Sequence, residues 1–181
     1  MTAAAAIRDA TEVSQWKPLS LFHFTLSVSS LERSIEFYTQ IGFSVLRNNA
    51  DVVWPDYVAV QFGLERAQGR GALLALGEGD LHTRLDLIQW LEPAARFPDT
   101  PFARTAPRIL AIRCENVRAA YEDLRARGVA FITPPRGPDA PTGIEAVVCC
   151  RDPDDTVVEL IEYMPGVLGS RIDSLERRSS S

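Results

Sequence analysis

The sequence contains one pattern twice, with the second version displaced by 86 positions. The first version runs over residues 23–43 and the second over residues 109–129, and the two align without a gap. Gly42 and Gly128 close the two versions at equivalent positions. Because a repeat fixes which positions of a chain are equivalent, each version is expected to form the same structural unit.

Each version predicts a strand, a helix, a glycine terminator and a second strand. In each version, apolar and polar residues first alternate with a period of two, and apolar residues at helical spacing follow. Ser29-Ser30 and Asn116 are expected at the starts of the helices, where such side chains cap free backbone N–H groups. The apolar stripes are Leu31, Ile35 and Tyr38, flanked by Phe37, in the first helix, and Val117, Ala120, Tyr121 and Leu124 in the second.

Further strands and turns are predicted from runs of apolar residues and from clusters of Pro, Gly and Asp. The strands are expected at 72–76, 85–90, 146–150 and 157–163, and the turns at 134–138 and 152–155. Residues 56–64 fit either a strand or a short helix.

The length of 181 residues suits one well-buried domain. A content of 46% hydrophobic and 24% charged residues is typical of a globular chain and argues against disorder. The predicted organisation is an N-terminal extension (1–19), a first module (20–92), a proline-rich linker (93–107), a second module (108–163) and a C-terminal tail (164–181). Both modules are expected to form one domain.

Charge and cysteine content limit the partners and the compartment. The net charge of -5 and the lack of a basic cluster argue against nucleic acid or membrane as a partner and favour a neutral or cationic small ligand. The odd number of cysteines, without Cys-x-x-Cys spacing, indicates a reducing compartment. No run approaches the ~20 apolar residues of a membrane span. The sequence therefore predicts a cytoplasmic protein.

Alternation assigns the side chains of the first strand of each version to two faces. Phe24, Leu26 and Val28 are expected to cover the helix, which leaves the polar His23, Thr25 and Ser27 on the other face. The equivalent positions of the second version are Ile109, Ala111 and Arg113. Two such sheets that curl their free faces together would enclose a pocket.

Two motifs resemble a known family. The run from His23 through Phe37-Tyr38 to Gly42-Phe43, and the run Arg151-Asp152-Pro153-Asp154-Asp155 before Glu159-Leu160, resemble the vicinal oxygen chelate superfamily. That superfamily includes glyoxalases, methylmalonyl-CoA epimerases, extradiol dioxygenases, fosfomycin-resistance enzymes and bleomycin-binding proteins. The resemblance implies an α+β fold of tandem βαβββ modules, which form a curved, mixed-sheet half-barrel with the helices outside.

The resemblance also implies a set of metal ligands. His23, Asp86 and Glu159 match three of the four ligand positions of metal-using members, whereas the fourth falls on Ile109, which cannot bind a metal. Three such donors can hold a divalent ion, with Mg, Mn, Fe, Ni and Zn as candidates and no organic cofactor implied. The loss of one ligand equally fits a metal-free member, so both readings stay open.

Three functions follow from these readings. The leading hypothesis is a glyoxalase-like lyase or isomerase that acts on a small carbonyl-containing substrate by metal-assisted proton transfer, in which Glu159 or Asp86 moves the proton. One alternative is a metal-free protein that binds a small molecule such as an antibiotic. Another is a cofactor-independent enzyme with Asp86 or Glu159 as base and Arg113 as oxyanion partner. A homodimer is implied by the family alone.

Four further side chains are candidates for substrate contacts. Trp54, Tyr57 and Trp90 fit the flat apolar walls of a small-molecule pocket, although they fit a core or dimer contact as well. Arg113 is expected on the pocket face, where it can pair with Glu159 or Asp86 in place of a metal. Such an arginine suits recognition of a carboxylate or phosphate.

Overall fold

The computed structural model describes residues 21–77, 83–96 and 108–166. The elements of this part, in chain order, are β1 (Phe24–Ser27), α1 (Leu31–Gln40), β2 (Ser44–Asn48), α2 (Tyr57–Gln61), β3 (Gln68–Leu76), β4 (Thr83–Glu92), β5 (Ile109–Arg113), α3 (Val117–Ala126), β6 (Ile144–Arg151) and β7 (Val157–Tyr163). None of the helices among these residues is long and apolar enough to cross a membrane.

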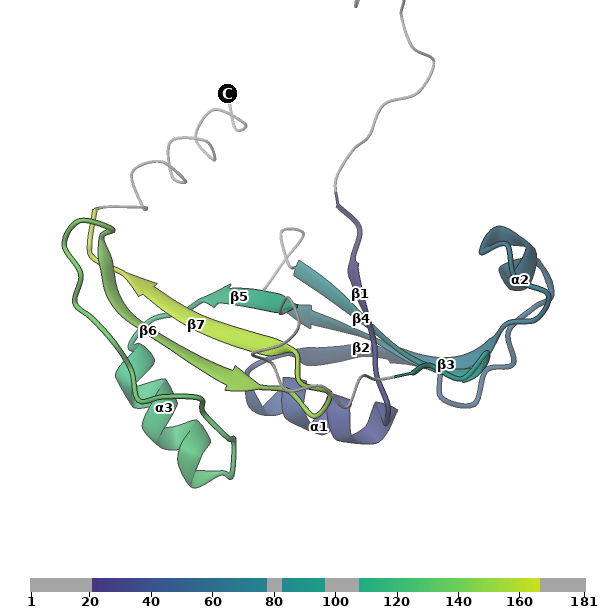
Figure 1. Ribbon diagram of the computed structural model, residues 1–181, viewed down its shortest axis with the longest axis horizontal. Coiled ribbons are helices and arrows are strands. Elements are labelled where there is room, and N and C mark those ends of the chain that lie inside the picture. The colour runs from purple at the N-terminus through teal and green to yellow at the C-terminus, as the bar shows by residue number, and fades with distance from the viewer. Residues whose placement is uncertain (1–20, 78–82, 97–107, 167–181) are drawn as a thin grey trace, which may run out of the picture.

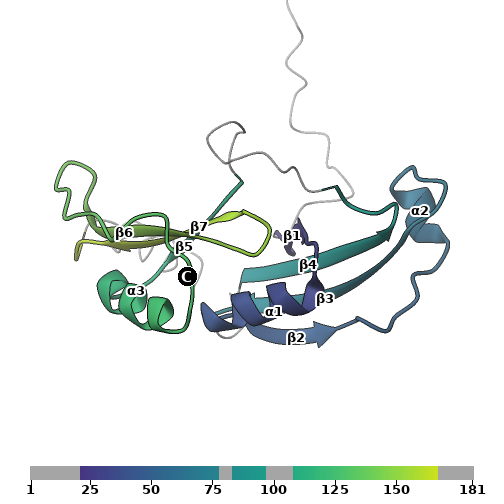
Figure 2. The ribbon, with the colours of Figure 1, turned by 60° about the horizontal axis from the view of Figure 1, so that its bottom comes forward.

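The strands form two open, mixed sheets, in the orders β1-β4-β3-β2 and β5-β7-β6. In each sheet the first strand of the repeat runs parallel to the last strand, and the other pairs are antiparallel. The two sheets lie side by side, and α1 and α3 cover the same side of them (Figures 1 and 2). We call the opposite side of each sheet its open face. The predicted α+β class is confirmed.

The 86-residue repeat is visible in the two long helices. α1 begins at Leu31 and α3 at Val117, and both are ten residues long. The predicted caps are present, since the side chains of Ser30 and Asn116 each accept a hydrogen bond from the backbone N–H three residues later. Gly42 follows α1 with φ +108°, a left-handed conformation that favours glycine and ends a helix.

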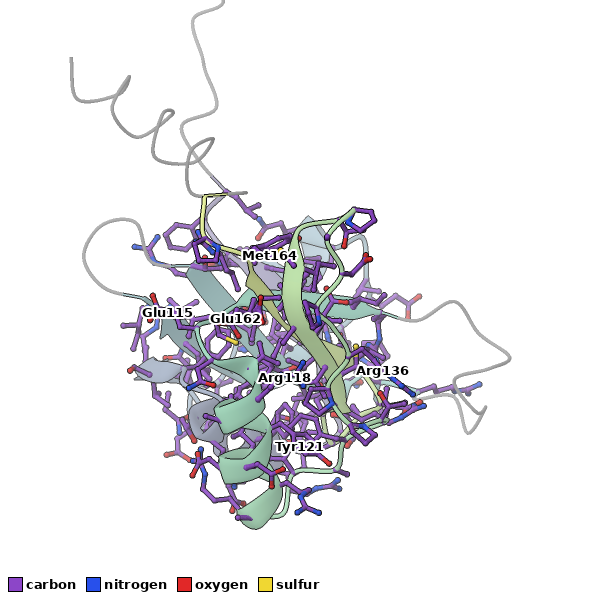
Figure 3. All side chains as sticks on the ribbon, turned by 90° about the vertical axis from the view of Figure 1, so that its left-hand side faces the viewer. Glu115, Arg118, Tyr121, Arg136, Glu162 and Met164 are labelled. Atoms are coloured by element: carbon purple, nitrogen blue, oxygen red, sulfur yellow. The ribbon has the colours of Figure 1, made fainter. Side chains whose placement is uncertain are left out.

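Side chains of the last strands bind the starts of these helices at equivalent positions. The backbone N–H of Leu31 donates to Oε1 of Gln89 at 3.0 Å, and the N–H of Val117 donates to Oε2 of Glu162 at 2.9 Å. Figure 3 shows Glu162 on β7 beside the beginning of α3, close to Arg118. Each helix is therefore fixed to its sheet by its own first turn, where backbone N–H groups lack partners within the helix.

The second module departs from the implied βαβββ pattern. The segment after Gly128 makes only isolated bridges to β6, at Phe131, Arg136 and Asp139, so the second sheet has three strands. Prolines occupy positions 134, 135, 138 and 141 of this segment, and proline cannot donate to a strand ladder. The segment that fitted either a strand or a helix forms α2. Of the predicted linker, residues 97–107 lie outside the described part.

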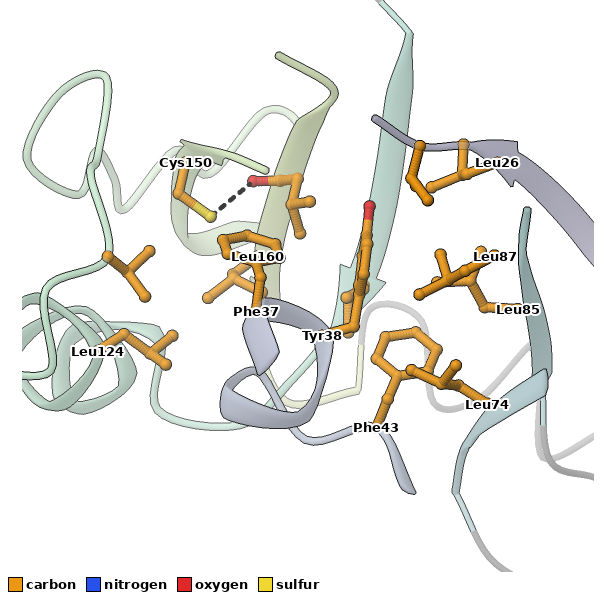
Figure 4. Packing of buried hydrophobic residues seen from close by; sticks show 14 of the residues in the cluster. Leu26, Phe37, Tyr38, Phe43, Leu74, Leu85, Leu87, Leu124, Cys150 and Leu160 are labelled. Atoms are coloured by element: carbon orange, nitrogen blue, oxygen red, sulfur yellow. Dashed lines mark hydrogen bonds between the residues drawn. The ribbon is translucent and has the colours of Figure 1, made fainter. Parts of the chain in front are cut away.

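A single buried cluster joins the two modules on the helix side. Leucines of the first sheet pack on one side of Tyr38, and Cys150 and Leu160 of the second sheet lie on its other side (Figure 4). The prediction that Phe24 covers the helix is wrong. Phe24 opens the edge strand β1 and is 52% exposed, whereas Leu26, two residues later, is buried.

A buried hydrogen bond crosses between the modules at the centre of this cluster. The hydroxyl of Tyr38 donates to Oδ2 of Asp152 at 2.8 Å, and Oδ1 of Asp152 accepts from the backbone N–H groups of Asp154 and Thr156. Burial raises the pKa of both the Asp152 carboxyl and the Tyr38 hydroxyl. The Asp-Pro-Asp-Asp motif thus ties the β6–β7 turn to α1.

Candidate functional site

Asp86 lies at the middle of a row that crosses the open face of the first sheet. Strand register aligns Thr25 with Asp86, Asp86 with Leu73, and Leu73 with Arg47. Paired residues of neighbouring strands share a face, so these four side chains project from the open side. The Thr25 hydroxyl donates to Oδ2 of Asp86 at 3.5 Å.

His23 and Arg47 are the cations that act on Asp86. Burial raises the pKa of the half-buried Asp86 carboxyl, and the charges of His23 and Arg47 oppose that rise. Nδ1 of His23 is buried and has no hydrogen-bond partner among the residues that the structure describes. The first sheet therefore brings His23 and Asp86 together, as a carboxylate whose pKa is raised beside an imidazole nitrogen without a partner among the described residues.

Glu159 occupies the equivalent place on the second sheet. Ala111, which lies 86 positions after Thr25, aligns with Glu159, and Glu159 aligns with Cys149 of β6. Burial raises the pKa of the half-buried Cys149 thiol, and the charge of Glu159 adds to that rise. The repeat thus places one carboxylate at the same point of each open face.

The predicted metal ligands do not gather within the described part of one chain. His23 and Asp86 lie together and both fit a divalent ion, but Glu159 is on the other sheet. No group of three His, Cys, Asp or Glu side chains able to hold a metal forms among the described residues. Ile109, at the position equivalent to His23, is 59% exposed. The residues of one chain therefore fit only part of a metal centre.

Three aromatic rings form a wall at one end of the first open face, which we call the aromatic wall. The ring of Trp90 contacts Trp54 at 5.1 Å and Phe62 at 5.7 Å between centroids, in edge-to-face geometry. Tyr57, predicted beside them, is 66% exposed on α2. Phe62 was missed because it ends a segment whose secondary structure the sequence leaves open.

Gly69 gives Trp54 the room to stand against β3. A Cβ atom at Gly69 would lie 2.6 Å from the Trp54 ring and 3.0 Å from the carbonyl oxygen of Gln89. We expect Gly69→Ala to lower the free energy of unfolding by about 2 kcal/mol, the usual cost of overpacking, as measured by urea denaturation. Gly71→Ala is a matched control, because its Cβ would also lie 3.0 Å from a carbonyl oxygen, that of Leu87, but touches no tryptophan.

A double mutant shows whether contact with the Trp54 ring causes the loss of stability in Gly69→Ala. In a Trp54→Ala background, Gly69→Ala should cost less than half as much as in the wild type. An equal cost in both backgrounds would mean that the ring does not press on β3.

A groove of about 370 Å³ lies on the helix side, away from these residues. It runs between α1 and the second module, and its lining includes Arg33, Phe37, Arg127 and Asp152. None of the predicted site residues lines it, so the open faces remain the candidate site.

Comparison with known proteins identifies the family. The family model described as Glyoxalase/Bleomycin resistance protein/Dioxygenase superfamily matches residues 20–160. The chain belongs to this superfamily. The resemblance seen in the sequence motifs is thereby confirmed. No curated protein matches the chain at a significant level.

Solved structures of this superfamily share the fold. A glyoxalase family protein from Bacillus cereus is 18% identical with a TM-score of 0.68, over 83% of this chain and 98% of that one. Leishmania major glyoxalase I is 21% identical with a TM-score of 0.56, over 91% and 100%. TnmS3, an antibiotic-binding protein from a Streptomyces species, is 24% identical with a TM-score of 0.55, over 82% and 98%. At these identities the likeness concerns the fold alone.

Proposed function

We propose that the protein is a lyase or isomerase that moves a proton on a small carbonyl-containing substrate bound at the open faces. The observation that carries the proposal is Asp86, a half-buried carboxylate with a raised pKa beside the unpartnered Nδ1 of His23. A carboxylate of raised pKa is a stronger base, and a proton next to a carbonyl group is weakly acidic. Asp86 takes up this proton, and Thr25 orients the carboxylate.

The remaining residues supply the surroundings of that step. His23 lies next to Asp86, and its unpartnered Nδ1 could bind a divalent ion. Such an ion would stabilise the oxyanion that develops on the carbonyl oxygen. The aromatic wall gives the substrate an apolar boundary at one end of the sheet.

Deuterium exchange tests the proposal directly. The protein, purified without chelator, is incubated in D₂O with small ketones and aldehydes, and the protons next to the carbonyl group are followed by NMR. Catalysed exchange that is lost in His23→Ala, together with a measured metal content of both proteins, supports the proposal. Failure of every carbonyl compound to exchange, or full exchange by His23→Ala, would contradict it.

We also propose that a second copy completes the site. In one chain the two open faces lie on the same side of the molecule, so they cannot face each other. A second copy laid over this side brings its Glu159 toward His23 and Asp86, which supplies the third donor.

Mixing two inactive variants tests this arrangement. His23→Ala and Glu159→Gln are each expected to lose most of the exchange activity. When the two are mixed after partial unfolding and refolding, hybrid dimers contain one intact site, so about a quarter of the wild-type activity should return under random association. No recovery in a mixture that forms dimers by size measurement would contradict a shared site.

A metal-free binding protein remains the second candidate. The aromatic wall favours it, because a cluster of aromatic rings suits contact with an apolar ligand such as an antibiotic. Stabilisation of the protein by an antibiotic in a thermal-shift assay, with no catalysed exchange, is the result that this candidate predicts.

A further inference from the structure

The arginines of the described chain differ in whether their guanidinium groups have partners. Eight arginines of the described residues are paired with carboxylates or backbone carbonyl groups. The ion pairs are Arg66–Glu92, Arg70–Glu32, Arg125–Glu122, Arg127–Asp123 and Arg151–Asp155, and the carbonyl contacts are those of Arg33, Arg108 and Arg118.

Three arginines on the open faces differ from this group. Arg47, Arg113 and Arg136 form no side-chain hydrogen bond or ion pair within the part of the chain that the structure describes. Arg47 lies on the row of Asp86. Arg113 aligns with Ile161 and Arg136 bridges to Val147 across from it, so both lie on the row next to that of Glu159.

The charge of the open faces is therefore opposite to that of the chain. The chain carries a net charge of -5. On the open faces, however, the register places Arg47, Arg113 and Arg136, and also Arg84, two residues before Asp86 on β4, against the carboxylates Asp86 and Glu159. A surface of one sign attracts ligands of the other sign whatever the net charge of the protein. An unpaired guanidinium is also a fork of donors that matches a carboxylate group.

We infer that the ligand of this site is an anion: a small carbonyl compound bearing a carboxylate group, which Arg47 binds while the carbonyl end lies at Asp86. This inference rests on the proposed function and adds the substrate class to it. β2 and β4 are separated by two strand spacings, about 10 Å. Leu73 of β3 lies between Arg47 and Asp86 in the register, so an arginine side chain that reaches across Leu73 would cover part of that distance and a molecule of a few carbon atoms the rest. The inference also argues against a cationic ligand, which the net charge alone favoured.

A pair of probes that differ only in charge tests the inference. Pyruvate has a carboxylate next to its carbonyl group, and methyl pyruvate is its neutral ester. The wild-type protein is expected to bind pyruvate about 10-fold to 100-fold more tightly than the ester, as for a charge-assisted hydrogen bond, when binding is followed by the intrinsic tryptophan fluorescence of the protein. Arg47→Gln should remove this difference by weakening pyruvate binding alone.

The control variant is Arg125→Gln, which deletes the same charge from the exposed surface of α3 and should leave both affinities unchanged. Equal affinity of the wild type for the two probes, no binding of pyruvate, or equal weakening of both probes by Arg47→Gln would overturn the inference. The proposed function is tested separately by deuterium exchange into methyl pyruvate, which does not need Arg47. If pyruvate binding depends on Arg47 but no exchange is catalysed, the inference about the ligand stands and the proposed enzymatic function is refuted.

Discussion

Asp86→Asn is expected to slow the exchange of protons next to a carbonyl group by about 100-fold or more, which is the typical contribution of a general base. The amide keeps the size of the side chain but cannot take up a proton. In the wild type, exchange should increase with pH as Asp86 ionises, and because burial raises its pKa, the midpoint should lie above the usual value for aspartate. The asparagine variant should lack that dependence.

Two variants separate the loss of a base from a loss of structure. Asp86→Glu keeps a carboxylate and should retain part of the exchange activity. Asp123→Asn changes an exposed carboxylate on α3 and should leave the exchange rate unchanged. Unchanged exchange by Asp86→Asn would show that another group moves the proton, and Glu159 would be the first to examine.

Asp152→Ala is expected to lower the free energy of unfolding by about 3 kcal/mol, the largest effect that we expect on stability. The change leaves the Tyr38 hydroxyl and the N–H groups of Asp154 and Thr156 buried without their acceptor, and each unpaired buried group costs about 1–3 kcal/mol. Urea denaturation measures it. The control Asp123→Ala, which removes an exposed ion pair with Arg127, should cost about 0.5 kcal/mol or less.

A double-mutant cycle with Tyr38→Phe measures the hydrogen bond between Tyr38 and Asp152, which joins the modules. If the hydroxyl of Tyr38 donates to Asp152, the loss caused by Asp152→Ala should be about 1–2 kcal/mol smaller in the phenylalanine background. Additive losses would mean that Asp152 stabilises only its own turn.

The repeat made most of the helix side of the fold predictable. Leu31 and Val117 begin helices of equal length because capping residues and apolar spacing act over a few neighbouring residues. Asp152 was different. The sequence predicts it in a turn, where aspartate is usually exposed, and only the hydroxyl of Tyr38, distant in sequence, explains its burial.

The candidate site was predictable where alternation is regular and not where it breaks. Asp86 and Glu159 lie on the expected faces because β4 and β7 alternate without interruption at these positions, and His23, just before β1, lies beside Asp86. Arg47 was missed because β2 has a bulge between Val45 and Arg47, and the extra residue shifts the face on which the following side chains lie. No local signal in the sequence marks that bulge. The separation of Glu159 from the other two was not predictable either, since it depends on how the sheets lie relative to each other.

The capping bonds of Gln89 and Glu162 explain how the two halves can diverge without unfolding. In both copies the helix side is held by equivalent residues: Leu31 and Val117 open the helices, and Leu87 and Leu160 lie beneath them. The open faces take no part in these bonds, and there His23 corresponds to Ile109. A gene duplication of this kind gives a protein two surfaces that can be altered independently on one conserved frame, so new ligand specificity can evolve in one half while the other keeps its chemistry.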